Sequence, residues 1–226
     1  MCTGVRFADA AGNLYFGRNL DWCESYGEGV VITPRGASIP TQFLGSLSPE
    51  HACVGMGIVV GGVPCYFDCA NEAGLAIAGL NFPGYAQFAE APEKGAVNVA
   101  AYEFPLWVAA SFSTVAEVLK DVVIVAKAPS EGYGVAQLHW LVGDGKESIV
   151  IECQADGMHV YDDGLDVLTN QPPFPWHTEN VRNYMHIETA HPEPVAWTRD
   201  TLRAFGSGAG MIGFPGGYDP ASRFVR

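Results

Sequence analysis

The sequence predicts an α+β fold, an αββα sandwich in which two mainly antiparallel sheets are covered by helices. Three observations support this: runs of strand-forming residues are separated by short turns, most of these runs are apolar throughout, and stretches with helical periodicity follow each group of strands. Apolar strands need cover on both faces, which a second sheet and helices supply. We expect one domain over residues 1–226, a routine length for a single domain.

Three groups of strands predict the two sheets. The segment GVRFADAAGNLYFGRNL has two β-favouring runs around a polar turn at residues 9–13, so it predicts a hairpin whose first strand begins at Cys2. Residues 53–82 predict a meander of three strands with turns at GGVP and NEAG. Residues 137–170 predict a second meander, because three Asp-Gly pairs separate β-rich runs there.

Four segments have helical signals. NVAAYEFPLWVAASF predicts a helix that Pro105 interrupts or kinks, since proline lacks an amide N–H. STVAEVLKDV predicts a better-defined helix, because Thr114 and Glu117 form a capping-box pattern. FPWHTENVRNYM and WTRDTLRAF predict two further helices, and the Gly-rich GSGAGMIGFPGGYDP after them predicts a loop.

Composition and charge exclude several functions. Asp and Glu outnumber Lys and Arg by 25 to 12, and the net charge of −13 argues against binding nucleic acid. No apolar run approaches the roughly 18 residues of a membrane span, and the N-terminus lacks the pattern of a signal peptide. We therefore expect a cytoplasmic protein without a membrane anchor.

Cysteines and histidines give no sign of a metal site. The six cysteines, in a chain with no export signal, are interpreted as free thiols. Cys65 and Cys69 lack further close-spaced ligands, which argues against structural zinc. The histidines show no metal-binding spacing, and GSGAG lacks the preceding strand that a dinucleotide loop requires. We expect neither a metal nor a cofactor.

Cys2 is the sharpest candidate for a catalytic residue, because loss of Met1 would make it N-terminal. A cysteine with a pKa of about 8.5 is only a few per cent thiolate at neutral pH. An α-amino group with a pKa of about 7.7 to 8.0 can accept its proton, so one residue can supply both nucleophile and base. The alternative is an ordinary small residue at the chain end.

Arg18, Asn19 and Asp21 lie on or just after the second strand of the predicted hairpin, opposite the strand that begins at Cys2. Strand alternation sends Arg18 and Asn19 to opposite faces, so at most one of them faces the thiol unless a bulge intervenes. An arginine in an apolar segment needs a partner, which Asp21 can supply. Either Arg18 stabilises the thiolate while Asp21 holds the amine, or the two form a surface ion pair.

Asn81 and Asn170 each end an apolar strand, in AGLNFPGY and DVLTNQPP. Amides at such positions can be turn residues. Alternatively, their N–H groups point at the oxyanion that develops during acyl transfer, where hydrogen-bond donors have their largest effect. Arg223, in ASRFVR, is uninformative by itself.

Six motifs together resemble one family. MCTGVRF, GRNLDW, NEAGLAIAGLNFPGYA, VLTNQPPF, NVRNY and PASRFVR are similar, in this order, to the cholylglycine hydrolase family of bile salt hydrolases and penicillin V acylases. The resemblance implies an N-terminal nucleophile hydrolase with an αββα fold, removal of Met1, and cleavage of amides through a thioester. It also implies a role for each of six residues. Cys2 is the nucleophile, Arg18 and Asp21 support it, Asn81 and Asn170 are the oxyanion-hole amides, and Arg223 is a second active-site arginine.

The resemblance also implies a substrate. Bile salt hydrolases tend to have asparagine and penicillin V acylases tyrosine at the position of Asn81, so Asn81 favours hydrolysis of bile salts conjugated to glycine or taurine. The motifs are most similar to those of Gram-positive gut bacteria, and the family implies a homotetramer. Trp22, Phe82 and Tyr85 are expected to contact the steroid. The near alternative is a penicillin V acylase or other N-acyl amide hydrolase, and the distant one is a non-catalytic ligand-binding protein.

The end of the chain departs from the family pattern. Family members continue past SRFVR with further strands and helices, so this chain is expected to lack C-terminal elements of the fold. Missing strands would leave sheet edges exposed and favour association. The low content of charged residues, 16%, also fits extensive buried surface that includes a subunit interface.

Overall fold

The structure is a computed structural model that describes residues 2–118, 122–184 and 193–202. The chain divides into two compact units, Met1–Phe174 and Pro175–Arg226, and the first of them contains both main sheets. The single domain over residues 1–226 stays a prediction.

A seven-stranded antiparallel sheet forms the centre of the first unit, in the order β13-β12-β11-β8-β7-β6-β3. Its strands are β3 (Gly29–Thr33), β6 (Cys53–Val60), β7 (Val63–Asn71), β8 (Ala76–Asn81), β11 (Leu138–Gly143), β12 (Ser148–Gln154) and β13 (Gly157–Asp162). The meander predicted over residues 53–82 is confirmed, and β8 joins it to β11, where Asn81 lies opposite Leu138.

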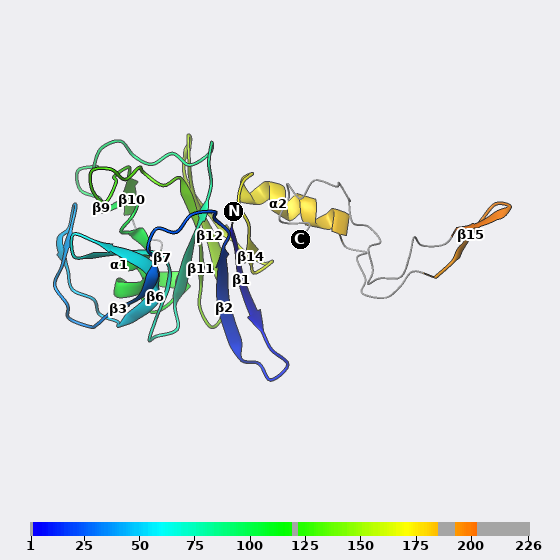
Figure 1. Cartoon of the computed structure of the whole chain (residues 1–226), viewed down its shortest axis with the longest axis horizontal. Coiled ribbons are helices and arrows are strands. Elements are labelled where there is room, and N and C mark those ends of the chain that lie inside the picture. The colour runs from blue at the N-terminus through cyan, green and yellow to red at the C-terminus, as the bar shows by residue number, and fades with distance from the viewer. Residues whose placement is uncertain (1, 119–121, 185–192, 203–226) are drawn as a thin grey trace. The chain divides into compact units, whose positions relative to one another are not determined.

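A second sheet has three antiparallel strands in the order β14-β1-β2. The predicted hairpin is confirmed as β1 (Cys2–Ala8) and β2 (Leu14–Leu20). Strand β14 (Val167–Leu168) comes from the predicted second meander, whose last turn takes the chain out of the seven-stranded sheet and places it beside β1 (Figure 1). The second meander is therefore shared between two sheets.

The two sheets approach each other closely where β1 crosses β11. A side chain at Gly4 would place its Cβ 3.0 Å from the Leu141 side chain, so only glycine allows this approach without a shift of the neighbour. An apolar cluster fills the space between the sheets, with members Cys2, Ala78, Leu80, Leu141, Val150, Leu168 and Phe174. The packing of the sheets thus buries Cys2.

Helix α1 (Phe104–Ser111) covers the other face of the seven-stranded sheet, beside β6 and β7 (Figure 1). The prediction that Pro105 interrupts this helix was wrong. The preceding residues form strand β9 (Val97–Ala100), and Pro105 lies in the first turn, where no helical N–H partner is needed. Helix α1 and the two sheets form an α, β, β succession of layers, as the predicted sandwich requires.

The helix predicted for STVAEVLKDV is, in the described residues, a single 3₁₀ turn, η1 (Val115–Glu117). Thr114 makes no capping hydrogen bond, and the Val115 N–H donates instead to the Asp144 carboxylate at 2.8 Å. The chain then enters β10 (Val122–Val125), which pairs in parallel with β9. Of the predicted capping pair, only Glu117 bonds a backbone N–H near the start of the turn, that of Ser113 at 2.8 Å.

A short two-stranded ribbon and two helices come next, and a second ribbon follows them along the chain. Strands β4 (Ile39–Thr41) and β5 (Gly45–Leu47) pair with each other. The described part of the segment FPWHTENVRNYM, residues 174–184, forms α2 (Phe174–Asn180) and the 3₁₀ helix η2 (Val181–Tyr184), as predicted.

The helix predicted for WTRDTLRAF was wrong in its described part. Residues 195–202 form a hairpin of β15 (Val195–Trp197) and β16 (Asp200–Leu202). Thr198, in the turn, has a positive φ of 52°, which is incompatible with a right-handed helix. The predicted Gly-rich loop lies outside the described residues.

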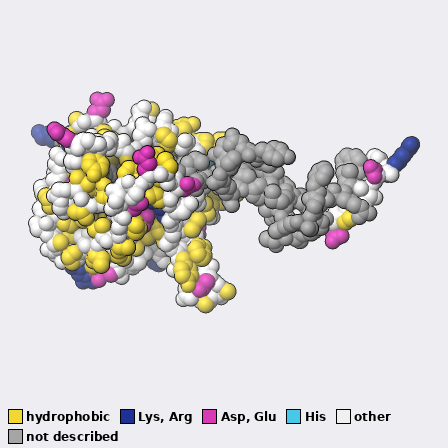
Figure 2. All heavy atoms as spheres, in the orientation of Figure 1, with side chains coloured by type: hydrophobic (Ala, Val, Ile, Leu, Met, Phe, Trp, Pro, Cys, Tyr) yellow, Lys and Arg dark blue, Asp and Glu magenta, His cyan; other side chains and the backbone are white. Residues whose placement is uncertain are grey.

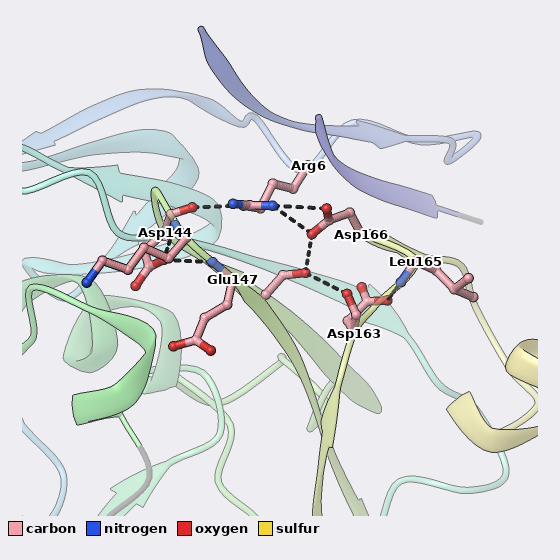
Figure 3. Close-up of polar contacts among 8 residues, drawn as sticks. Arg6, Asp144, Glu147, Asp163, Leu165 and Asp166 are labelled. Carbon is pink, nitrogen blue, oxygen red and sulfur yellow. Dashed lines mark hydrogen bonds and ion pairs between the residues drawn. The ribbon is translucent and has the colours of Figure 1, made fainter. Parts of the chain in front are cut away.

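Arg6 connects the β1–β2 hairpin by hydrogen bonds to two turns of the chain, at Asp144 and Asp166 (Figure 3). Its Nη1 donates to both oxygens of Asp166, at 3.0 and 2.9 Å, and its Nε donates to the Asp144 carbonyl at 2.8 Å. The Ser148 hydroxyl adds a hydrogen bond of 2.6 Å to Asp166. We call Arg6, Asp144, Ser148, Asp163 and Asp166 the Arg6 cluster.

The tip of the same hairpin projects from the body of the first unit with apolar side chains on its surface (Figures 1 and 2). Phe7 and Tyr15 stack there with ring centroids 5.3 Å apart and remain half exposed. Among the helices of the described segments, none has the length and apolar character needed to cross a membrane.

Candidate active site

Cys2 lies at the start of β1 and is only 1% exposed. Register places Cys2 opposite Leu20 and Gly4 opposite Arg18, so the side chain of Arg18 points to the same face as that of Cys2. The Arg18 Nη2 atom lies 3.4 Å from the Cys2 sulfur. The exposed Asn19 faces the other side, as strand alternation predicts.

Arg18 is held by the seven-stranded sheet. Its Nη2 also donates to the Gly79 carbonyl at 2.9 Å, and its Nη1 lies 3.6 Å from the Asp68 carboxylate. The ion-pair partner seen in the structure is therefore Asp68 on β7, which the sequence did not single out; the role of Asp21 stays a prediction. Among the described residues, no acceptor satisfies the buried Arg18 Nε.

A β-bulge between β6 and β7 orients the Asp68 side chain toward Arg18. The register of β6 and β7 shifts at Met56 and Gly57, so that Met56 pairs with Asp68, Gly57 pairs with Tyr66, and Phe67 is the extra residue. Burial raises the pKa of Asp68, and the Arg18 charge opposes that rise. The bulge thus turns Phe67 toward a cavity while Asp68 meets the arginine.

Asn170 links the nucleophile to the end of β8. The backbone N–H of Cys2 donates to Asn170 Oδ1 at 2.6 Å, and Asn170 Nδ2 donates to the Asn81 carbonyl at 2.7 Å. Asn170 is 4% exposed; its contact with the Cys2 nitrogen is buried and its contact with the Asn81 carbonyl is partly buried. The structure thus brings together four of the predicted residues: Cys2, Arg18, Asn81 and Asn170.

A buried polar pair supports the segment that follows Asn81. Phe82 is fully buried and stacks on His139 with centroids 4.3 Å apart, and His139 Nδ1 lies 3.0 Å from Glu152 Oε1. Tyr85 stacks on Phe82 and is 40% exposed. Neither Phe82 nor Tyr85 lines the cavity described next. The Phe82 ring is fully buried and stacks on His139 instead.

A cavity of about 350 Å³ opens beside Arg18. Its walls are mostly apolar and aromatic, and they include Trp22, Tyr26, Phe67 and Leu138. Trp22 is the one of the three predicted substrate contacts that lines it. Asn81 and residues 133–136 complete part of the wall.

Several residues of this site gave no signal in the sequence. Asp68, Tyr102 and Lys127 lie far from Cys2 along the chain and in no motif, so only pairing of the strands could reveal them. Arg223 lies outside the described residues. Within residues 2–118, 122–184 and 193–202, no group of three or more His, Cys, Asp or Glu side chains could hold a metal ion.

Comparisons with known proteins agree on one family. The family of linear amide C–N hydrolases called the choloylglycine hydrolase family matches residues 2–226. A bile salt hydrolase/transferase of Bifidobacterium longum is 54% identical over all of this chain and 72% of its own length. A conjugated bile acid hydrolase of Lactobacillus gasseri is 48% identical over all of this chain and 73% of its own length.

A solved structure confirms the fold. The C2A mutant of conjugated bile acid hydrolase from Clostridium perfringens superposes with a TM-score of 0.91 at 35% identity, over all of this chain and 70% of that one. The match of the family to residues 2–226 and the fold agree with the six motifs. The chain therefore belongs to the choloylglycine hydrolase family of linear amide C–N hydrolases.

Proposed function

We propose that this chain hydrolyses the amide bond of bile salts conjugated to glycine or taurine, with Cys2 as the nucleophile. The observation that carries the proposal is the buried Cys2 thiol, 3.4 Å from a guanidinium and tied through its backbone nitrogen to Asn170. The relatives from Bifidobacterium longum and Lactobacillus gasseri are named for hydrolysis of bile salts or conjugated bile acids.

The cavity supports an anionic, largely apolar substrate. The charged side chains that line it are Arg18 and Lys127, both cations, although the chain as a whole carries a net charge of −13. Aromatic walls suit a steroid, and positive charge favours an acid conjugate over a neutral or cationic one.

The first half of the reaction uses the nitrogen of Cys2 as a base. Removal of Met1 turns this nitrogen, which donates to Asn170 Oδ1 at 2.6 Å, into an α-amino group. Because one N–H of the amine is held by Asn170, its lone pair remains able to accept the thiol proton. Arg18 stabilises the resulting thiolate, which attacks the amide carbon to form the C–S bond and a tetrahedral oxyanion.

The second half releases two products. N–H groups of Asn81 and Asn170 stabilise the oxyanion. The C–N bond then breaks, and the nitrogen of glycine or taurine takes the proton from the protonated α-amino group of Cys2. A thioester between the Cys2 sulfur and the steroid acid remains. Water attacks the thioester while the α-amino group accepts a water proton, the C–S bond breaks, and the proton returns to the sulfur.

The test is release of free glycine and taurine from conjugated bile salts by the purified 226-residue chain, with the intact mass recorded to show whether Met1 is present. Cys2→Ala is expected to abolish release. The matched control is Cys23→Ala, which removes an exposed cysteine outside the cavity and should retain release. No release from folded chains that begin at Cys2 would overturn the proposal.

A substrate panel separates the near alternative. Phenoxymethylpenicillin cleaved faster than every bile salt would identify a penicillin V acylase. We also propose a cytoplasmic protein that assembles as a homotetramer; fractionation of the source cells and mass photometry of the purified chain test these two points.

A further inference from the structure

A buried carboxylate lies between the two sheets, and the proposed reaction does not use it. Glu152 on β12 is fully buried, and Val150, two positions before it, belongs to the apolar cluster between the sheets. Because side chains alternate along a strand, Glu152 faces the same layer as Val150. A carboxylate buried among apolar side chains is costly unless hydrogen bonds satisfy it, so its partners indicate its role.

One oxygen of Glu152 joins two segments of the chain. Oε1 accepts the backbone N–H of Phe174 at 3.0 Å and lies 3.0 Å from His139 Nδ1. A carboxylate only accepts hydrogen bonds, so Nδ1 is the donor of the second contact. The other oxygen, Oε2, accepts a hydrogen bond from Gln154 Nε2 at 3.1 Å. Since no described residue bonds His139 Nε2, the bond to Glu152 sets the rotation of the imidazole ring in its plane.

Each of these two segments leads to one of the two asparagines assigned to the oxyanion hole. The His139 ring stacks on Phe82 with centroids 4.3 Å apart and planes 6° from parallel, and Phe82 directly follows Asn81. Phe174 follows Asn170 by four residues, and two of the three residues between them are prolines, whose fixed φ stiffens this link. One carboxylate oxygen therefore connects the two asparagines indirectly, in addition to the direct bond of 2.7 Å from Asn170 Nδ2 to the Asn81 carbonyl.

The two asparagines come from different sheets, so their separation has to be held. Asn81 ends β8 of the seven-stranded sheet, whereas Asn170 follows β14 of the three-stranded sheet. Donors stabilise an oxyanion only within hydrogen-bond distance of the position that it will occupy, so a small shift between the sheets misplaces one donor. We propose that Glu152 and His139 are positioning residues that hold Asn81 and Asn170 at the separation required for oxyanion stabilisation. This inference rests on the proposed function and adds the groups that align its oxyanion hole.

The first test changes Glu152 in two ways. Glu152→Leu removes both hydrogen bonds of Oε1, so kcat for a glycine conjugate should fall about 100-fold. The KM should stay within about threefold, because Glu152 does not line the cavity. Glu152→Gln keeps an oxygen for Phe174 and His139, and the Gln154 amide can turn to accept from the new NH₂ group, so kcat should return to within about fivefold of the parent. Parental kcat in Glu152→Leu, or equal losses in the two variants, would overturn the inference.

Two further variants separate the arms of this connection from general damage. His139→Phe keeps a ring against Phe82 but cannot donate to Glu152, so kcat should fall about tenfold, less than in Glu152→Leu, because the bond to Phe174 remains. An unchanged kcat would remove His139 from the proposal. Ser148→Ala is the control, since it deletes a buried hydroxyl with two hydrogen bonds on the same strand. Its kcat should stay within about twofold, and a loss as large as that of Glu152→Leu would mean that any damage to β12 has this effect.

An aldehyde probe repeats the comparison without turnover. The Cys2 sulfur adds to the aldehyde analogue of a bile acid by forming a C–S bond, while the thiol proton passes to the former carbonyl oxygen, which occupies the position of the oxyanion. Its affinity, measured by protection of Cys2 from iodoacetamide, should fall about 100-fold in Glu152→Leu and recover in Glu152→Gln. Alkylation itself forms no oxyanion, so without aldehyde its rate at Cys2, read by peptide mass, should be the same in all three chains.

These measurements distinguish failure of the inference from failure of the proposed function. If no conjugate is hydrolysed but aldehyde affinity follows the expected order, Glu152 positions the oxyanion hole and the proposed reaction fails. If conjugates are hydrolysed but aldehyde affinity is equal in the three chains, the hydrolysis holds and the positioning role fails. Alkylation slowed in Glu152→Leu as much as kcat would place the effect on the nucleophile and would likewise contradict the inference.

Discussion

The β1–β2 hairpin carries two arginines whose surroundings differ. Arg6 and Arg18 have side chains that are 10% and 6% exposed, so burial does not distinguish them. Arg6 Nη1 donates to both oxygens of Asp166, and Nε donates to the Asp144 carbonyl (Figure 3). Arg18 faces its carboxylate at 3.6 Å, contacts a thiol, and has a buried Nε that no described residue satisfies.

The difference indicates what each arginine does. A guanidinium that contacts both oxygens of one carboxylate through Nη1 and a carbonyl through Nε is fixed and neutralised, which suits a structural joint. A guanidinium with a looser pair retains positive field for another anion, at a cost in folding free energy. We therefore expect substitution of Arg18 to affect mainly activity and substitution of Arg6 to affect mainly stability.

The largest effect is expected for Arg18→Met. Loss of the guanidinium removes the positive charge beside the Cys2 sulfur, so the thiolate is less favoured and kcat/KM should fall by about 10²- to 10³-fold. Steady-state hydrolysis of a glycine conjugate measures this, and thermal unfolding shows whether the fold is kept. A fall of less than threefold would contradict the assignment of Arg18 to the site.

Asn170→Ala tests the link between the nucleophile and β8. It removes both the acceptor for the Cys2 nitrogen and the donor to the Asn81 carbonyl, so we expect kcat to fall about 100-fold. Single-turnover kinetics locate the loss in formation of the thioester. Thr178→Ala, an exposed substitution in α2, is the control. Equal kcat for Asn170→Ala and the parent chain would contradict the role.

The sequence predicts the local parts of this site and not its long-range parts. The hairpin that places Arg18 opposite Gly4 follows from alternation and a polar turn, so Cys2 and Arg18 could be paired in advance. Asp68 could not, because its approach to Arg18 depends on a bulge in a different sheet. Motif resemblance, and not periodicity, selected Asn81 and Asn170.

The errors in secondary structure have the same origin. Thr114 and Glu117 satisfy the capping-box pattern, yet the Thr114 side chain caps no N–H of the turn, and the Asp144 carboxylate from a distant turn accepts the Val115 N–H. Pro105 was predicted to interrupt a helix because the sequence does not show that the helix begins at Phe104, which places the proline in its first turn. Both cases depend on where a distant or preceding segment ends, which local propensity does not encode.

Arg6→Met is the counterpart of Arg18→Met and tests whether Arg6 acts mainly on stability. It leaves the Asp166 carboxylate without its arginine partner, so we expect the free energy of unfolding to fall by about 2 kcal/mol. Urea denaturation measures this. The kcat of the folded fraction should stay within about twofold of the parent, and a fall comparable to that of Arg18→Met would remove the distinction between the two arginines.

A pH-dependent effect, absent at pH 4, is expected at Asp163, the exception within the Arg6 cluster. Its Oδ2 is buried without a partner among the described residues, and burial raises the pKa of this carboxyl to about 6. The pKa in the folded chain lies above the value of about 3.9 in an unfolded chain. The stabilising contribution of the protonated form is therefore full below about pH 4 and is lost as the pH rises through about 6.

Asp163→Asn removes this loss, because asparagine stays neutral and its Oδ1 can still accept the Leu165 N–H. We expect the variant to be more stable than the parent at pH 8, by at most about 3 kcal/mol, the linkage value of a rise of about two pKa units, and nearly equally stable at pH 4, in urea denaturation at both pH values. Asp162→Asn, at the exposed neighbouring position, should show no such pH dependence. If Asp163→Asn were instead less stable than the parent at pH 8, the charged Asp163 carboxylate would stabilise the Arg6 cluster. Every carboxylate of that cluster would then contribute to stability, as expected around a structural arginine and in contrast to Arg18.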